Sequence, residues 1–87
     1  MKETFVGCTN LKTPPSLIPE SVDNLNKTFM DCSILEGKLS INANPSIYEN
    51  CFYGSAINSK GVIITGNSNL LEQIINTKSL ESNIMQE

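Results

Sequence analysis

Apolar positions recur along this chain at a nearly constant interval. The isoleucines at 18, 41 and 64 follow one another every 23 residues. Two further columns keep the same interval: Leu25, Tyr48 and Leu71, and Phe29, Phe52 and Ile75. Upstream, residues 4–11 match residues 28–35 at a shift of 24. Several apolar columns that shift together are typical of a repeat architecture, in which each unit packs on its neighbours.

Within each interval, a short aliphatic segment predicts one brief strand. The segments 16–18, 39–41 and 62–64 alternate side chains in the manner of a half-buried strand. A polar corner follows each segment, and the residues aligned after it are Asp23, Ser46 and Asn69. Side chains of these types are common helix N-caps, because their oxygens accept hydrogen bonds from free amides of the first turn.

A short helical turn is predicted after each of these cap residues. Ser46 and Glu49 have the spacing of a capping box, and Asn69 and Glu72 come close to it. The aligned apolar pairs are four residues apart, which places each pair on one face of a helix: Leu25 and Phe29, Tyr48 and Phe52, Leu71 and Ile75. Each unit is therefore expected to be a strand, a corner, a helical turn and a return.

These residues resemble a known repeat family. The run from Ile18 to Val22, followed by Leu25, by residues 28–32 and by Leu35, looks like the 23-residue bacterial leucine-rich repeats of BspA-like surface proteins. The resemblance covers residues 4 to 77, with departures at Asn42, Ser55 and Asn58. It implies a curved solenoid with strands on its concave side, an activity in adhesion or protein recognition, and an extracellular or cell-surface location.

The expected fold is thus an α/β solenoid in one domain covering residues 1–87. It would be a leucine-rich-repeat-like stack of about three repeats, with one short strand and one short helical turn in each. The units would span residues 4–28, 29–51 and 52–75, and residues 76–87 would form a C-terminal capping tail. Met1 to Glu3 is too short to cap the first unit, so an open first strand and self-association through it are expected.

Composition and charge exclude several partners. The 87 residues carry six lysines, no arginine and a net charge of −3, which leaves no basic stripe for nucleic acid. No apolar run approaches the roughly 20 residues of a membrane span, and the first seven residues lack the apolar stretch of a signal peptide. We therefore expect no nucleic-acid partner and no membrane insertion.

The cysteines and the other candidate chemical groups favour a protein without catalysis. Cys8, Cys32 and Cys51 are widely spaced and odd in number, which suits small buried thiols better than a disulfide framework or a zinc site. Cys8 and Cys32 share one column, and both are expected to be reduced and buried. The chain has no histidine and no glycine-rich phosphate loop, so we expect no enzyme activity, no metal and no cofactor.

The expected binding surface follows from strand alternation. If Leu39, Ile41, Val62 and Ile64 face the core, the concave face holds the residues between and beside them, namely Leu17, Pro19, Ser40, Asn42, Ile63 and Thr65. The partner would be a protein of unknown identity. Two other functions stay open: a small standalone inhibitor or regulatory protein on the same scaffold, and a structural spacer without a specific partner.

Overall fold

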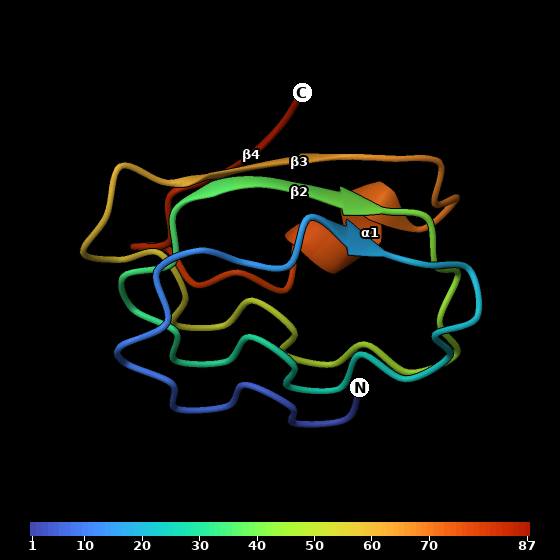
Figure 1. The fold of residues 1–87 in the computed structure, drawn as a ribbon, viewed down its shortest axis with the longest axis horizontal. Coiled ribbons are helices and arrows are strands. Elements are labelled where there is room, and N and C mark those ends of the chain that lie inside the picture. Colours follow the sequence, from blue (N-terminus) through green and yellow to red (C-terminus); the bar gives the residue numbers. More distant parts are fainter.

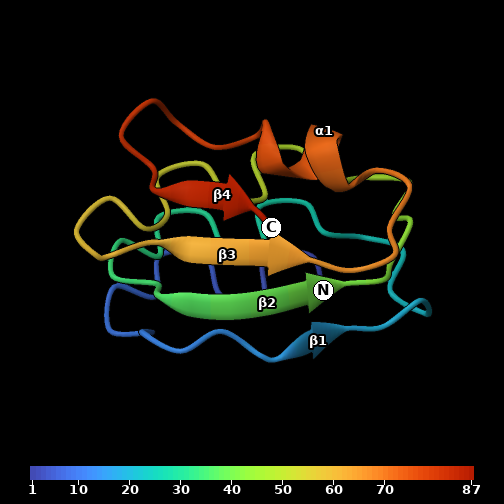
Figure 2. The same ribbon diagram turned by 90° about the horizontal axis from the view of Figure 1, so that it is seen from above.

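The computed structural model covers residues 1–87. Its main element of regular secondary structure is one parallel sheet. Four strands lie side by side in chain order, as Figure 2 shows: β1 (Leu17–Ile18), β2 (Gly37–Ile41), β3 (Val62–Thr65) and β4 (Ile84–Gln86). One short helix, α1 (Leu71–Ile75), lies between β3 and β4 in the chain. The chain is therefore a small α/β protein with little helix, and the three strands predicted from alternation are confirmed.

Three non-helical segments lie across the core from the sheet (Figure 1). They comprise residues 1–11, 25–35 and 48–58, and together we call them the turn ladder. Each consists of successive tight turns, such as the one closed by Thr28 N–H on the carbonyl of Leu25 at 3.2 Å. Neighbouring segments are joined by backbone hydrogen bonds, such as Phe29 N–H to the carbonyl of Cys51 at 2.8 Å.

The turn ladder corrects the prediction of a helical turn in every unit. Lys27, Asp31, Asn50 and Gly54 all have positive φ, from 53° to 73°, which a right-handed helix does not allow. Asp, Asn and Gly tolerate this conformation best, and each of the four is the third residue of a tight turn. In the first two units the i, i+4 pairs still share a buried side, but turns place them there instead of helices. In the third unit the predicted helix is confirmed, because Leu71 and Ile75 are buried on α1.

The cap residues also have another role than the predicted one. Ser46 N–H and its hydroxyl donate to the Asp23 carboxylate at 3.2 and 2.8 Å, so this column links one segment to the next. Asn69 precedes the only helix, but the N-cap of α1 is Leu70, without a side-chain cap bond. Neither Ser46–Glu49 nor Asn69–Glu72 forms a capping box.

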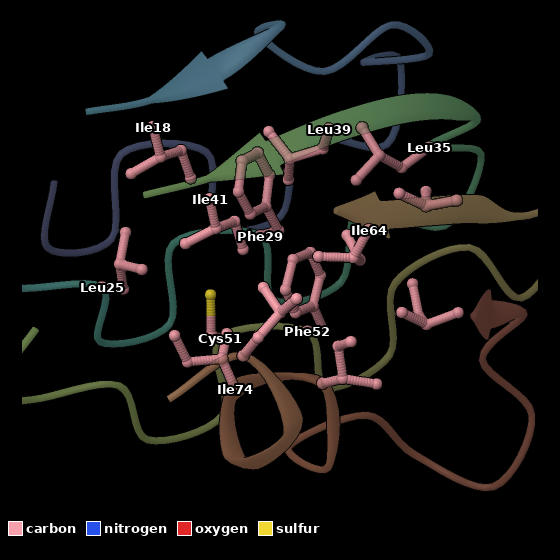
Figure 3. Close-up of a cluster of buried hydrophobic side chains, with 14 of the residues drawn as sticks. Ile18, Leu25, Phe29, Leu35, Leu39, Ile41, Cys51, Phe52, Ile64 and Ile74 are labelled. Carbon is pink, nitrogen blue, oxygen red and sulfur yellow. The ribbon is translucent and has the colours of Figure 1, made fainter. Parts of the chain in front are cut away.

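The core lies between the sheet and the turn ladder (Figure 3). Leu39, Ile41, Val62 and Ile64 are buried, as alternation predicted. On the ladder side, the phenylalanine rings form a continuous stack, with centroid distances of 5.5 Å from Phe5 to Phe29 and 5.3 Å from Phe29 to Phe52. The stack carries the 23- and 24-residue spacing of the sequence into the centre of the molecule.

The register between β2 and β3 differs from the predicted one. Ile18 pairs with Ile41 as expected, but Ile64 pairs with Leu39, two residues away from the predicted partner. Gly66 then comes opposite Ile41, where a Cβ atom would lie 2.3 Å from the Ile41 carbonyl oxygen. Because the shift is an even number of residues, every side chain keeps its predicted face.

The C-terminal segment was expected to act as a polar capping tail. Instead, Ile84 pairs with Val62 and the segment adds a fourth strand to the sheet. The residues between α1 and β4 cover the end of the turn ladder, where Thr77 and Ser79 accept hydrogen bonds from it. The tail therefore extends the sheet on one side and closes the ladder on the other.

Candidate binding surface

The outward side chains of β1 to β4 form a surface that we call the outer sheet face. One row across it contains Leu17, Ser40 and Thr65, which are aligned by the pairing of their strands. Leu17 is 46% exposed, whereas Ser40 and Thr65 are partly buried. Adjacent strands lie about 4.8 Å apart, so the three side chains form one continuous strip.

A second row of the outer sheet face includes two residues that the sequence reasoning missed. Ile63 was predicted, and the register places it between Lys38 on β2 and Met85 on β4. Met85 is 57% exposed, and β4 itself was not predicted, since three residues offer too little alternation to identify a strand. The strand pairing brings an aliphatic and a thioether side chain together at the centre of this row.

Two predicted site residues lie outside these rows. Pro19 is exposed just beyond the end of β1, where it has no partner across the sheet. Asn42 follows β2, and its side-chain oxygen accepts a hydrogen bond from Asn67 N–H at 2.9 Å. Asn42 therefore holds the corner together, while Leu17, Ser40, Ile63 and Thr65 remain on the outer sheet face.

Charge adds little to this surface. The only ion pair in the structure joins Lys38 Nζ and Glu87 Oε1 at 3.5 Å, at the edge of the second row. Both side chains are more than half exposed, and an exposed pair of this kind contributes only about 0–1 kcal/mol. The outer sheet face is therefore mixed in character, with hydroxyl, aliphatic and thioether groups and one charged edge.

A shallow hollow away from the sheet is lined by residues 46–49. Of its two hydroxyl groups, the one on Ser46 donates a hydrogen bond to the carboxylate of Asp23 at 2.8 Å. The side chains of Tyr48 and Glu49 make no hydrogen bond to that hydroxyl. The Ser46 hydroxyl therefore links two segments of the chain at this hollow.

The three thiols differ in their exposure. Cys32 and Cys51 are fully buried, whereas Cys8 is only partly buried, which corrects the prediction that Cys8 is a buried thiol. Cys32 Sγ donates a hydrogen bond to the Phe5 carbonyl at 3.0 Å. Burial raises the pKa of Cys32 from 9.0 to about 11 and that of Cys51 from 9.0 to about 12. Both buried thiols thus stay protonated and unreactive at neutral pH.

The structure contains neither a cluster of metal-ligating side chains nor a helix that could span a membrane. No group of three or more histidine, cysteine, aspartate or glutamate side chains is placed so that it could hold a metal ion. The only helix, α1, has five residues, so it is far too short to span a membrane. No protein-family model, curated protein or solved structure matches this chain.

Proposed function

We propose that this chain is a short leucine-rich-repeat-like solenoid that acts as a protein-recognition or adhesion module without catalysis. The stacked phenylalanines, the chain-order parallel strands and the bonded turn segments support a solenoid reading. The departures from the family pattern, with turns in place of helices, make the units simpler than the resemblance implies. The outer sheet face is the surface through which this module would recognise its partner.

The observation that carries the proposal is the composition of the outer sheet face. Leu17 on β1 and Met85 on β4 are about half exposed on the two edge strands of a hydrogen-bonded sheet, and Ile63 on β3 lies beside Met85. Exposed aliphatic and thioether side chains on a rigid element lose little conformational entropy on binding and release water from apolar surface. Methionine also adapts its shape to different partners. A face with these side chains is better suited to recognition than a strand face that carries only polar side chains.

The size of the molecule limits how such a module binds. A standard protein interface covers about 800 Å² on each partner. The whole chain exposes 4705 Å², so an interface of that size would use roughly one sixth of its surface. Four short strands offer only part of that area. The adjoining loop with Leu80, which is fully exposed, lies in the same C-terminal region and would extend the contact.

A site-specific photo-crosslinking experiment tests the proposal. A benzoylphenylalanine residue at Thr65 lies on the outer sheet face, and the same residue at Asn50 lies on the exposed side of the turn ladder. We expect one cellular protein to be crosslinked from position 65 and not from position 50. That protein, once purified, should bind the unmodified chain saturably.

A face variant provides the matched control. Ile63→Asp places a charge in the second row of the outer sheet face, and we expect it to weaken the binding of the purified partner at least tenfold. Tyr53→Asp, at an exposed position of the turn ladder, should leave binding unchanged. Equal crosslinking from both positions, or equal loss in both variants, would rule out the outer sheet face.

A further inference from the structure

Most backbone hydrogen bonds between segments of the turn ladder point in one direction, with an N–H group of the earlier segment donating to a carbonyl of the later one. The two exceptions, Ala56 N–H to Cys32 O and Asn58 N–H to Ser33 O, lie near the C-terminal ends of their segments. One row crosses the whole molecule: Phe5 N–H to Thr28 O (3.0 Å), Phe29 N–H to Cys51 O (2.8 Å), and Phe52 N–H to Thr77 Oγ1 (3.0 Å). The acceptor and the next donor in this row belong to the same peptide unit. The row is therefore a chain of aligned peptide dipoles.

Two parallel rows repeat this arrangement. The first contains Gly7 N–H to Met30 O (2.8 Å), Asp31 N–H to Tyr53 O (2.8 Å), and Gly54 N–H to Ser79 Oγ (3.2 Å). The second contains Glu3 N–H to Asn26 O (2.8 Å) and Lys27 N–H to Glu49 O (2.8 Å). Aligned peptide dipoles reinforce one another and leave partial negative charge on the carbonyl end, as they do in a helix. The ladder thus has an acceptor end and a donor end.

In two of the three rows, the donor end is closed by the chain itself. The Thr77 and Ser79 hydroxyls accept from the third segment, and Ser79 Oγ lies 2.9 Å from Ser82 Oγ. Between them, Lys78 Nζ donates to the Ile84 carbonyl at 3.1 Å, on β4. The side chains that follow α1 therefore occupy the positions that acceptors of another segment would take.

The acceptor end is open in the structure. It presents the carbonyls of Lys2, Thr4 and Val6, which receive no hydrogen bond and belong to exposed residues. Beside these carbonyls, Phe5 is the outermost ring of the stack and is only partly buried. This end combines a row of acceptors at alternate residues with an apolar surface.

The neighbouring edge of the sheet does not offer the same opportunity. β1 is only two residues long, with Pro15 two residues before it and Pro19 directly after it. Proline has no N–H group to donate and is typical of sheet edges that resist the addition of another strand. The ladder end is therefore the place where an added segment would find its hydrogen bonds.

We propose that the acceptor end of the turn ladder binds a segment of a partner polypeptide that presents N–H groups at alternate residues and an aromatic or aliphatic side chain against Phe5. Such a segment would extend the ladder in the way that an added strand extends a sheet. A second copy fits poorly, because two acceptor ends offer carbonyls to each other and the donor end is occupied by Thr77 and Ser79. The acceptor end is a different surface from the outer sheet face.

A peptide with the sequence of residues 25–35, carrying serine at position 32, is a suitable probe because its own N–H groups point in the required direction. Titrated into the isotope-labelled full chain, it should shift the ¹³C carbonyl resonances of Lys2, Thr4 and Val6. The carbonyls of Glu3 and Phe5, which accept bonds inside the first segment or from Cys32, should shift much less.

N-methylated peptides separate hydrogen bonding from apolar contact. Methylation of the nitrogen at position 29 removes a central donor and should weaken binding at least tenfold. Methylation at position 33, whose N–H makes no hydrogen bond in the chain, should not. The proposal is overturned if no carbonyl resonance shifts at about millimolar peptide, the weak end of specific association. It is also overturned if both methylated peptides bind equally, or if the full chain dimerises through residues 1–11.

Discussion

The sheet and the turn ladder enclose the same core but are organised differently. In the sheet, side chains alternate strictly between core and solvent, and the register changes by two residues between one pair of strands and the next. In the ladder, the backbone hydrogen bonds that residues 3 to 31 donate to the next segment keep a spacing of 22 or 23 residues, as from Phe5 to Thr28 and from Phe29 to Cys51. The periodic signal in the sequence therefore comes mainly from the ladder.

The comparison shows what a buried column does and does not specify. Apolar spacing identifies which residues face the core, because burial is the same whatever backbone carries the side chain. A spacing of four residues fits a row of tight turns as well as a helix. The secondary structure therefore depends on which residues adopt a positive φ angle. Asp31 and Asn50 allow the turns, whereas residues 71–75 contain no such position and form α1.

The largest expected effect is on the phenylalanine stack. Phe29→Ala should lower the free energy of unfolding by about 3–5 kcal/mol, because the ring is fully buried between two others. Tyr53→Ala, on the exposed side of the same ladder, should change it by less than about 0.5 kcal/mol. Urea unfolding of both variants provides the measurement. A loss below about 1 kcal/mol for Phe29→Ala would mean that the stack does not support the core.

The register shift in the sheet predicts an unequal cost for two glycine substitutions. Gly66 has φ of 125°, and a Cβ there would lie 2.3 to 2.7 Å from the backbone of Ile41. Gly66→Ala should therefore cost about 3 kcal/mol or more, since strain and overpacking add. Gly7 has φ of 69° with no atom within 4 Å, so Gly7→Ala should cost only about 1 kcal/mol. Equal thermal midpoints for the two variants would contradict the observed register.

The closed end of the ladder can be opened by one substitution. Thr77→Val removes the hydroxyl that accepts from Phe52 N–H and donates to the Ile74 carbonyl. We expect a loss of about 1–3 kcal/mol in unfolding free energy, because a partly buried amide is left without an acceptor. Thr77→Ser keeps the hydroxyl and should cost less than about 1 kcal/mol. If Val and Ser are equally tolerated in urea unfolding, the hydroxyl does not cap the ladder.

The buried thiols predict a smaller effect at alkaline pH. Burial raises the pKa of Cys51 from 9.0 to about 12, so above pH 9 the unfolded chain loses this proton while the folded chain keeps it. The contribution of Cys51 is fully present below pH 9 and is lost as pH rises toward about 12, by at most about 1.4 kcal/mol per pH unit. Cys51→Ala should therefore show a flatter decline of stability with pH. Identical slopes in wild type and variant would show that Cys51 is not shielded from water.

Much of the fold could be predicted from the sequence, for reasons that particular residues make clear. The alternation in Leu39 to Ile41 and Val62 to Ile64 was enough to identify two strands and their buried faces. The register was not predictable from spacing, because it depends on the lack of room for a Cβ at Gly66, which is a tertiary contact. The predicted N-cap role of Ser46 was wrong for a similar reason, since its hydroxyl donates instead to Asp23 of the preceding segment.

The candidate surface was only partly accessible from sequence. Leu17, Ser40, Ile63 and Thr65 were placed on the outer sheet face by alternation alone. Met85 was missed because β4 is short and follows a polar stretch, so only its pairing with Ile63 shows that it belongs to the same row. The open carbonyls of the first segment had no signal in the sequence, since every residue type has one.

Through-hydrogen-bond scalar couplings test most directly whether turns, and not helices, carry the buried columns. The account predicts a correlation between the amide nitrogen of Phe29 and the carbonyl carbon of Cys51, whose oxygen lies 2.8 Å from that nitrogen. A leucine-rich-repeat helix would instead connect each amide to the carbonyl four residues earlier. A correlation from Phe29 to Leu25, with none to Cys51, would contradict the account.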